Sequence, residues 1–316
     1  MIKVGVLGVG GISGCHIPAW QKIPEVRLVA LCDIRPQQTE KYKDSGMHIY
    51  TDFEDMVANE ELDILDICLP TYLHVEYSIK AMNMGMNVLC EKPISLNIED
   101  VDRVYAAAKK NNVKFMVAHV LRFWNEYVYL KNIYDNKTYG NFLCGSVKRL
   151  GNTPKWSWDN WMTDPDRSGL VPFDLHIHDL DFIVYAFGLP SDFKTFRSKG
   201  KNEDSIHAVY LFDNGSYISA DSAWYNNDYP FTTGYRFQFE RAVVEFDGKT
   251  ISIYESNGNI STVGSDVTGD SCINLPPTNA YFDEIKYFTD CVIKDKPADI
   301  IKPEELKLVL TALKSF

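Results

Sequence analysis

The stretch Gly8-Val9-Gly10-Gly11-Ile12-Ser13-Gly14 follows directly on a short apolar run, Lys3–Leu7, and precedes a helical pattern. A strand, a glycine-rich loop and a helix in this order are typical of the turn that binds the pyrophosphate of a dinucleotide. Gly8 permits a tight turn, Gly10 lets the backbone approach the phosphates, and the helix N-terminus offers N–H groups to them. The cofactor-binding residues predicted in this loop are Gly8, Gly10, Gly11, Ile12 and Ser13, of which Ser13 replaces the third glycine.

Asp33 ends the next apolar run, Arg27–Cys32. Its spacing from the loop is close to the ~20 residues at which this fold places a carboxylate for the ribose hydroxyls. A carboxylate repels a 2′-phosphate, so the sequence favours NAD as the cofactor. Arg35 is able to neutralise such a phosphate, which keeps NADP as the alternative. The competing interpretation of the loop is a glycine-rich turn in an unrelated sheet protein.

The composition is that of a globular chain large enough for two domains. It has 316 residues, 45% of them hydrophobic and 24% charged, and a domain typically takes about 100–200 residues. The formal charge of −11 disfavours nucleic acid or an anionic membrane as a partner. No apolar run approaches the ~18 residues of a membrane span, and we find no signal peptide pattern. The seven cysteines form no CxxC pair, so we expect reduced cysteines and a cytoplasmic protein.

Residues 1–121 predict a dinucleotide-binding domain with an α/β fold. Short apolar runs alternate there with helical segments, which is typical of a Rossmann-type, doubly wound parallel sheet. Asp52 and Asn97 are placed to cap two of the helices. The runs expected to form strands are Lys3–Leu7, Arg27–Cys32, Ile64–Leu69, Asn87–Cys90 and Lys114–Ala118.

Residues 122–316 predict an α+β domain for substrate binding and oligomerisation. Strand-like segments follow one another without intervening helices, so we expect a mostly antiparallel open sheet. Asp213-Asn214-Gly215 and Asp247-Gly248 suit its hairpin turns. Two helical stretches, Tyr281–Ile293 and Pro303–Leu313, close the chain, and the last helix is free to pack back on the first domain.

The segment Ile206–Phe212 predicts a sheet with two apolar faces. Tyr210 lies on one face of the strand, while Val209 and Leu211 lie on the other. Because a single layer of helices covers only one face, we expect the second face to meet another subunit in a homo-oligomer, a dimer or a tetramer. The alternative is a face that is exposed or covered by loops.

Lys92 follows the apolar run Asn87–Cys90 and precedes Pro93. A lysine at a buried strand end is costly unless it has a partner or a function, because desolvation opposes its charge. Pro93 restricts Lys92 to extended geometry, which aims the side chain in one direction. The competing interpretation is a surface lysine before a turn.

A second cluster is Asp174-Leu175-His176-Ile177-His178-Asp179-Leu180-Asp181. In an α-helix Asp174 and His178 lie one turn apart on one face, so the carboxylate is placed to orient the imidazole. On that geometry His176 points elsewhere and is structural. We expect no metal, because a zinc-hydrolase HxHxDH motif is broken after Asp179.

Three further residues are candidates for holding substrate. His119 and Arg122 follow the last predicted strand of the first domain, and Trp161 lies in a tryptophan-rich stretch. The alternative for Arg122 is a structural pair with an acidic neighbour. The alternative for Trp161 and its neighbours is interdomain packing by large aromatic side chains.

These motifs together resemble the glucose–fructose oxidoreductase/inositol dehydrogenase/MocA family. The matching elements, in chain order, are the Gly8-x-Gly10 loop with His16, Leu69-Pro70-Thr71-Tyr72-Leu73-His74, Cys90-Glu91-Lys92-Pro93, Arg122-Phe123, Asp164–Gly169 and Asp174-x-x-x-His178-Asp179-x-Asp181. The resemblance implies that Lys92, Asp174 and His178 form the catalytic triad. It further implies that Leu69, Pro70, His74 and Glu91 lie near the dinucleotide. Leu170–Phe173 depart from the glycines that often precede the catalytic aspartate, which we expect to reshape the substrate pocket.

The resemblance implies hydride exchange between a nicotinamide and a carbinol or carbonyl of a sugar, cyclitol or related polyol. In that reaction His178 suits the general base, Asp174 holds its tautomer, and Lys92 hydrogen-bonds the alkoxide-like oxygen. One alternative is a dinucleotide-binding regulator that has lost the chemistry. Another is an NAD-dependent glycoside hydrolase that oxidises its sugar transiently.

Overall fold

The computed structural model describes residues 1–264 and 278–316. The described residues form two compact units, each of which is described here by itself. One unit contains Met1–His119 and Asn279–Glu304. The other begins at Val120 and also contains Glu305–Phe316. Among the described residues, no helix is long and apolar enough to cross a membrane.

The first unit is built on a six-stranded parallel sheet with the order β3-β2-β1-β4-β5-β6. This is the doubly wound Rossmann arrangement predicted from the sequence. The short strand β3 was not predicted. The strands are β1 Ile2–Leu7, β2 Val26–Cys32, β3 His48–Tyr50, β4 Ile64–Ile67, β5 Asn87–Glu91 and β6 Phe115–Ala118.

Helices connect these strands, and for two of them, α3 and α5, an N-cap was predicted from the sequence. The Asp52 side chain accepts a hydrogen bond from the Asp55 N–H at 3.0 Å, so the cap of α3 is confirmed. The N-cap of α5 is Ile98, so the prediction of Asn97 is wrong by one residue. The helices are α1 Ser13–Gln21, α2 Pro36–Thr39, α3 Phe53–Asn59, α4 His74–Asn83 and α5 Glu99–Asn111.

The chain returns to the first unit near its end. Helix α9, Ala280–Ile293, packs against α1 and β5. Helix α10, Pro303–Leu313, belongs to the second unit instead. The segment that returns to the first unit is therefore α9, while packing of the last helix on the first domain stays a prediction.

The second unit contains an eight-stranded sheet with the order β14-β13-β12-β11-β7-β10-β9-β8. Its neighbours are antiparallel except β7 and β10, which run parallel, so the expected mostly antiparallel sheet is confirmed. Gly215 and Gly248 sit in the hairpins with φ of 84° and 96°. The strands are β7 Phe142–Asn152, β8 Asp192–Lys199, β9 Asp204–Leu211, β10 Tyr217–Tyr225, β11 Thr232–Phe239, β12 Ala242–Phe246, β13 Thr250–Glu255 and β14 Ile260–Gly264.

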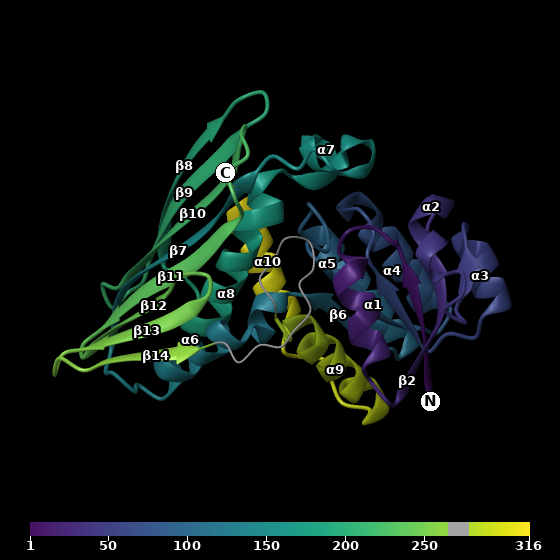
Figure 1. Cartoon of the computed structure of the whole chain (residues 1–316), viewed down its shortest axis with the longest axis horizontal. Coiled ribbons are helices and arrows are strands. Elements are labelled where there is room, and N and C mark those ends of the chain that lie inside the picture. Colours follow the sequence, from purple (N-terminus) through teal and green to yellow (C-terminus); the bar gives the residue numbers. More distant parts are fainter. Residues whose placement is uncertain (265–277) are drawn as a thin grey trace. The chain divides into compact units, whose positions relative to one another are not determined.

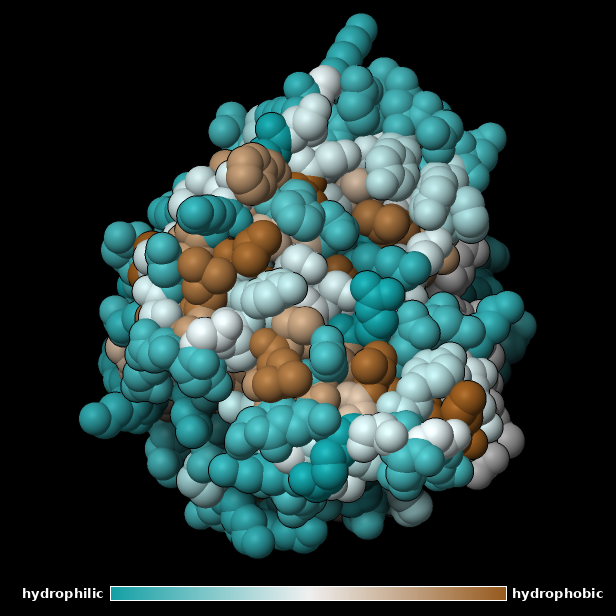
Figure 2. All heavy atoms as spheres, turned by 90° about the vertical axis from the view of Figure 1, so that its left-hand side faces the viewer, coloured by the Kyte–Doolittle hydropathy of each residue, from teal (hydrophilic) through white to brown (hydrophobic). Residues whose placement is uncertain are grey.

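Helices cover one face of this sheet. Figure 1 shows α6 (Asn125–Asp135), α8 (Ile177–Phe187) and α10 on the same side of the strands. In β9 the residues that face the helices, such as Tyr210, are buried, while Val209 and Leu211 on the other face are half-buried. Figure 2 shows this other face, where apolar side chains gather among polar ones.

The cysteines depart in one place from the expectation of reduced thiols. Cys32, Cys68, Cys90, Cys144 and Cys291 are free. Cys15 takes part in a disulfide bond, so the expectation is wrong at this position.

Candidate functional site

The glycine loop has the geometry that a dinucleotide-binding turn requires. Gly8 has φ of 94°, and a Cβ at this position would lie 2.6 Å from the Cys68 carbonyl oxygen, so only glycine fits. Around Gly10 the space is open, since the nearest atom to an added Cβ is Arg35 Nη2 at 3.9 Å. Ser13 Oγ donates to the Gly10 carbonyl at 2.7 Å and thereby closes the loop onto the first turn of α1. These features fit a pyrophosphate against the backbone.

Asp33 is buried directly after β2 and accepts hydrogen bonds from two residues, Val9 and Arg35. Its Oδ2 accepts the Val9 N–H at 2.9 Å, which ties the glycine loop to β2. Its Oδ1 accepts the Arg35 Nε–H at 3.1 Å, and Arg35 Nη2 lies 3.3 Å from Oδ2. The carboxylate predicted to select NAD and the arginine predicted to admit NADP are therefore an ion pair in this structure.

Leu69, Pro70 and His74 lie where β4 leads into α4. Leu69 and Pro70 are half-buried, and His74 is buried. His74 Nε2 contacts the Leu69 carbonyl oxygen and Nδ1 contacts the Pro93 carbonyl oxygen, both at 2.7 Å. His74 therefore links the loops that follow β4 and β5. Its contact with a dinucleotide stays a prediction.

Lys92 directly follows β5, at the carboxyl edge of the parallel sheet. This is the edge where open α/β sheets bind their ligands. The Lys92 N–H donates to Glu91 Oε2 at 3.0 Å, and the Lys92–Pro93 peptide is cis. The predicted placement of Lys92 at a buried strand end is confirmed, while its catalytic role stays a prediction.

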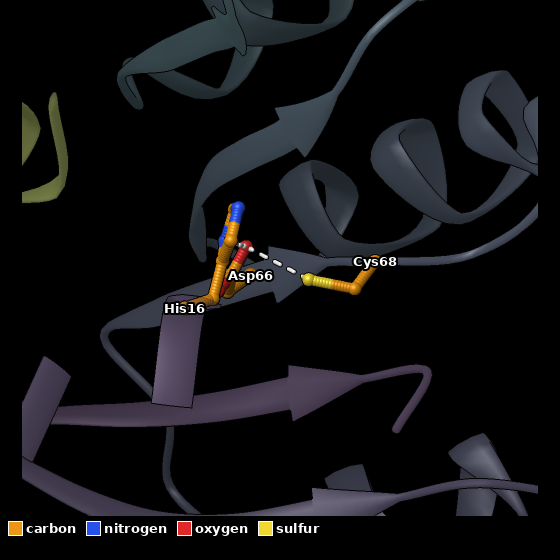
Figure 3. A group of neighbouring side chains, drawn as sticks. All are labelled: His16, Asp66 and Cys68. Atoms are coloured by element: carbon orange, nitrogen blue, oxygen red, sulfur yellow. Dashed lines mark hydrogen bonds and ion pairs between the residues drawn. The ribbon is translucent and has the colours of Figure 1, made fainter. Parts of the chain in front are cut away.

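Glu91 belongs to a buried cluster around His16 on α1 and Asp66 on β4. His16 Nδ1 lies 3.1 and 2.9 Å from the two Asp66 oxygens, and His16 Nε2 lies 3.0 Å from Glu91 Oε1. Asp66 Oδ2 also accepts the Trp20 Nε1–H at 2.7 Å. Figure 3 shows the His16 ring beside the Asp66 carboxylate, with the Cys68 thiol on the other side of that carboxylate.

The protonation of this cluster follows from its charges. Burial alone would lower the pKa of His16, but the charge and hydrogen bond of Asp66 outweigh it and raise the pKa well above 6.5. Burial alone would raise the pKa of Glu91, but its hydrogen bond and charge pairing with His16 lower it. Burial next to Asp66 raises the pKa of the Cys68 thiol to about 12. The cluster thus consists of an imidazolium, two carboxylates and a neutral thiol.

His16, Asp66 and Cys68 also place three potential metal-ligand atoms within 4.8 Å of one another. Both Asp66 oxygens already accept hydrogen bonds from His16, and one also accepts from Trp20. Cys68 Sγ also donates to Asp66 Oδ1, at 3.7 Å. The chemistry of the cluster is therefore that of a hydrogen-bonded ion network.

In the second unit, Asp174 and His178 lie on consecutive helical segments. Asp174 is in a π-helical turn, Pro172–His176, and His178 is in the first turn of α8. The expected α-helix across both residues is therefore wrong at Asp174. The backbone there forms i→i+5 hydrogen bonds, as in a π-helix, instead of the i→i+4 hydrogen bonds of an α-helix. Both side chains are half-buried. Their catalytic roles, together with Lys92 of the first unit, stay predictions.

Two buried arginines hold the helix that carries His178. Arg149 on β7 pairs with Asp179, with Nε–Oδ2 at 3.0 Å and Nη2–Oδ1 at 3.1 Å. Arg122 pairs with Asp181, with Nε–Oδ2 at 2.9 Å and Nη2–Oδ1 at 2.7 Å. Arg122 also donates to Glu305 at 2.7 Å, and its side chain is fully buried. These contacts correspond to the structural alternative for Arg122.

His176 is buried between two hydroxyl groups. Its Nδ1 lies 2.9 Å from Ser222 Oγ and its Nε2 lies 2.6 Å from Tyr210 OH. Burial lowers the pKa of His176 to about 3, so the ring is neutral. The prediction that His176 is structural is confirmed.

Trp161 and the residues before Asp174 pack in the interior of the second unit. Leu170 and Val171 belong to a buried cluster with Ile206, against which Trp161 packs. Leu170 has φ of 62°, a conformation that favours glycine, and keeps it while its side chain is buried. Two of the four side chains expected to reshape the substrate pocket, Leu170 and Val171, thus contribute to this core, and the reshaping itself stays a prediction. Substrate binding by Trp161, and by the buried His119 at the end of β6, stays a prediction.

Sequence reasoning missed the partners of these residues. In the sequence His16, Asp179 and Asp181 stand out only as matching positions of the family resemblance, and no motif marks Asp66 or Arg149. One signal was available, because Asp66 is a carboxylate inside the apolar run Ile64–Leu69. A charge in a buried strand requires a partner.

Two family models match the chain. The model described as "Oxidoreductase family, NAD-binding Rossmann fold" matches residues 2–119, and the GFO/IDH/MocA C-terminal domain matches residues 127–259. The chain spans about half the length of the first curated relatives that it matches.

Three similar proteins have named activities. The 2,7-anhydro-N-acetylneuraminate hydratase of Mediterraneibacter gnavus is 30% identical over 60% of this chain and 50% of its own. The glucose-6-phosphate 3-dehydrogenase of Bacillus subtilis is 28% identical over 65% of this chain and 59% of its own. The crystal structure of myo-inositol 2-dehydrogenase from Lactobacillus plantarum has a TM-score of 0.81 at 24% identity and covers 99% of this chain and 95% of its own. With both family models matched in chain order, the protein belongs to the GFO/IDH/MocA family of oxidoreductases, whose N-terminal domain is an NAD-binding Rossmann fold.

Proposed function

We propose that this protein oxidises or reduces a carbinol carbon of a sugar, cyclitol or related polyol, with NAD as the cofactor and NADP as the alternative. The observation that carries the proposal is the position of Lys92. It follows the buried strand β5 at the carboxyl edge of the sheet whose first turn is the Gly8 loop. Its backbone N–H is held by the Glu91 carboxylate. The named activities of the sugar and inositol dehydrogenases in the family support the substrate class.

The residues of the glycine loop fit the dinucleotide. Gly8 and Gly10 give the backbone room, the first turn of α1 offers N–H groups, and Asp33 is placed for the ribose hydroxyls. When bound, the nicotinamide supplies the acceptor or the donor of the hydride.

The side chains of the chain itself manage the proton. In the oxidation direction His178 accepts the O–H proton of the alcohol, and Asp174 orients the imidazole and stabilises its charged form. Lys92 donates a hydrogen bond to the same oxygen and stabilises the negative charge that develops on it. In the reduction direction His178 returns the proton.

The experiment is a screen of sugars, inositols and amino sugars with both dinucleotides, followed by absorbance of the reduced nicotinamide. For the active substrate we expect Lys92→Ala to abolish turnover while the dissociation constant of NAD changes by no more than a few-fold. Full activity in this variant would contradict the role of Lys92. Dinucleotide binding without turnover of any substrate would favour the regulator instead.

The hydratase among the relatives adds anhydro sugars to the screen, and the alternative of transient oxidation requires a second readout. A reaction that oxidises its sugar transiently consumes substrate without accumulating NADH. The screen therefore also follows substrate loss by chromatography. Loss of a glycoside or anhydro sugar without net NADH would assign this protein to that class, which includes the hydrolase alternative.

We further propose that the sheet of the second unit forms the interface of a homo-oligomer. The face that the described helices leave open carries exposed apolar side chains, among them Phe196 at 63% and Tyr217 at 45% exposure. A hollow of about 490 Å³ on it is lined by Phe196, His207 and Tyr225, among others. We expect Phe196→Glu to lower the mass measured by light scattering, whereas Met84→Glu, at an exposed site of the first unit, leaves it unchanged. An unchanged mass in both variants would argue against this interface.

A further inference from the structure

We propose that His16 and Glu91 are positioning residues for Lys92: a buried imidazolium held between two carboxylates fixes the carboxylate that accepts the Lys92 N–H. The inference rests on the proposed function of Lys92. Its structural part, the ion network itself, concerns only described residues of the first unit. The family resemblance assigned Glu91 to the surroundings of the dinucleotide and gave His16 no role.

The geometry around His16 requires a proton on each ring nitrogen. Nδ1 faces the two oxygens of Asp66 at 3.1 and 2.9 Å, and Nε2 faces Glu91 Oε1 at 3.0 Å. A carboxylate only accepts hydrogen bonds, so a neutral ring would point one lone pair at an anionic oxygen. The imidazolium donates to both sides and offsets part of the negative charge that the two carboxylates bring into the interior.

The contacts of Asp66 with Trp20 and His16 fix the end of the network that lies farthest from Lys92. Asp66 accepts from Trp20 Nε1 at 2.7 Å in addition to His16. The side chains of His16 and Asp66 are fully buried, and that of Glu91 is 9% exposed. Because β4 carries Asp66 and α1 carries His16, two elements of the sheet domain determine where the Glu91 carboxylate lies.

Glu91 in turn fixes the backbone of Lys92 by a hydrogen bond. Its second oxygen, Oε2, accepts the Lys92 N–H at 3.0 Å. On the other side of Lys92, the Pro93 carbonyl contacts His74 Nδ1 at 2.7 Å. The peptide that precedes Lys92 is thus anchored to a buried imidazole through Glu91, and the peptide that follows Pro93 is anchored to a second one directly. A displacement of about 1 Å in a group that contacts the reacting atoms costs on the order of 100-fold in rate.

The first test measures activity and binding in Glu91→Gln and His16→Gln. The amide that Glu91→Gln introduces carries a donor nitrogen, which would face either His16 or the Lys92 N–H, so one contact is lost. We expect kcat to fall by about 10- to 100-fold in each variant, while the dissociation constant of NAD changes by less than about threefold. The double variant should be no slower than the slower single variant, because both residues act through one contact. Additive losses in the double variant would overturn the proposal.

Matched controls show whether the loss comes from the kind of substitution or from its position in the buried network. Glu61→Gln and His48→Gln make the same changes at exposed side chains of the same unit. We expect both to retain the rate of the unmodified protein. A loss in the controls equal to that in Glu91→Gln and His16→Gln would also overturn the proposal.

The second test does not use activity. In residue-resolved hydrogen exchange by NMR, Glu91→Gln should speed exchange at the Lys92 amide at least tenfold and leave the amides of Val88 and Leu89 in β5 unchanged. Equal acceleration throughout β5 would mean general destabilisation and would overturn the proposal. In the unmodified protein both ¹⁵N shifts of the His16 ring should be those of imidazolium at pH 7.5. A neutral His16 ring would also overturn the proposal, even if Glu91→Gln and His16→Gln were folded and had a low kcat.

The two tests separate this inference from the proposed function. If no substrate turns over, the proposed function fails, while the exchange and the ring shifts still decide whether the network holds the Lys92 peptide. If the substrate turns over normally in Glu91→Gln, the positioning role fails and the proposed function stands.

Discussion

Arg149 on β7 donates two buried hydrogen bonds to Asp179 on α8, with Nε–Oδ2 at 3.0 Å and Nη2–Oδ1 at 3.1 Å. The Arg149 guanidinium also donates to Tyr127 OH at 3.2 Å. Burial alone would lower the pKa of Arg149, but the adjacent Asp179 carboxylate raises it. The pair fixes the helix turn next to His178 to the sheet.

Breaking this ion pair should be costly. Asp179→Asn leaves the Arg149 charge buried with a weaker partner, and we expect the free energy of unfolding to fall by about 3–5 kcal/mol. Urea denaturation measures this change. The apolar pair Arg149→Met with Asp179→Leu should recover most of the loss, because it removes both charges. Arg103→Met, which breaks an exposed pair with Asp100, should cost less than about 1 kcal/mol. Equal costs for Asp179→Asn and Arg103→Met would contradict the anchoring role.

In the glycine loop, substitution of Gly8 should affect stability, whereas substitution of Gly10 should affect NAD binding. Gly8→Ala places its Cβ 2.6 Å from a backbone oxygen at φ of 94°, so we expect a loss of more than about 1 kcal/mol of stability. Gly10→Ala meets only Arg35 Nη2 at 3.9 Å and should fold normally. Its Cβ projects where the pyrophosphate approaches, so NAD affinity should fall at least tenfold by calorimetry. Gly14→Ala, with no atom within 4 Å, is the control for both measurements. Normal NAD affinity in Gly10→Ala would place the phosphates elsewhere.

Much of the fold could be predicted because its strands are long enough to carry a pattern. Continuous apolar runs marked the buried parallel strands, and glycines at 215 and 248 marked the hairpins that the structure contains. Strand β3 was missed because three residues, His48–Tyr50, are too few to show a period. Strand β14, Ile260–Gly264, was missed because its apolar side chains, Ile260 and Val263, lie three positions apart and show no strand alternation.

The site could be predicted only as separate residues. Lys92 and His178 were found from motifs, but the groups that hold them are distant in sequence. Asp66 lies 50 positions from His16, and Arg149 lies 30 positions from Asp179. No local spacing encodes such pairs. The π-turn at Asp174 was also not predicted, since residue patterns alone do not distinguish it from an α-turn.

The Asp33–Arg35 ion pair predicts the choice of dinucleotide. Asp33 is 6% exposed and engages Arg35, so a 2′-phosphate would meet a carboxylate and an arginine already neutralised by it. We expect NAD to raise the melting temperature more than NADP at equal concentration. Asp33→Ser removes the carboxylate and releases Arg35, so the preference should move toward NADP by at least tenfold in the ratio of dissociation constants. The double variant Asp33→Ser with Arg35→Ala should lose this gain. A stronger shift with NADP in the unmodified protein would contradict the assignment.

The His16 network predicts how stability depends on pH. The pKa of His16 is raised above 6.5 in the folded protein, so its contribution is complete below 6.5 and is lost as pH rises through the folded value. The pKa of Glu91 is lowered from 4.5, so its contribution is present above 4.5 and is lost as pH falls through the folded value. Both contributions are complete together between pH 4.5 and 6.5.

The measurement is the difference in free energy of unfolding between the unmodified protein and His16→Gln, taken by urea denaturation from pH 5 to pH 10. We expect this difference to be largest at pH 5–6.5 and to shrink toward alkaline pH, because the folded protein then releases the proton that the network holds. His48→Gln, at an exposed position, is the control and should give a small difference. A difference for His16→Gln that grows toward alkaline pH would mean that the folded protein prefers a neutral ring between Asp66 and Glu91, against the geometry of their oxygens.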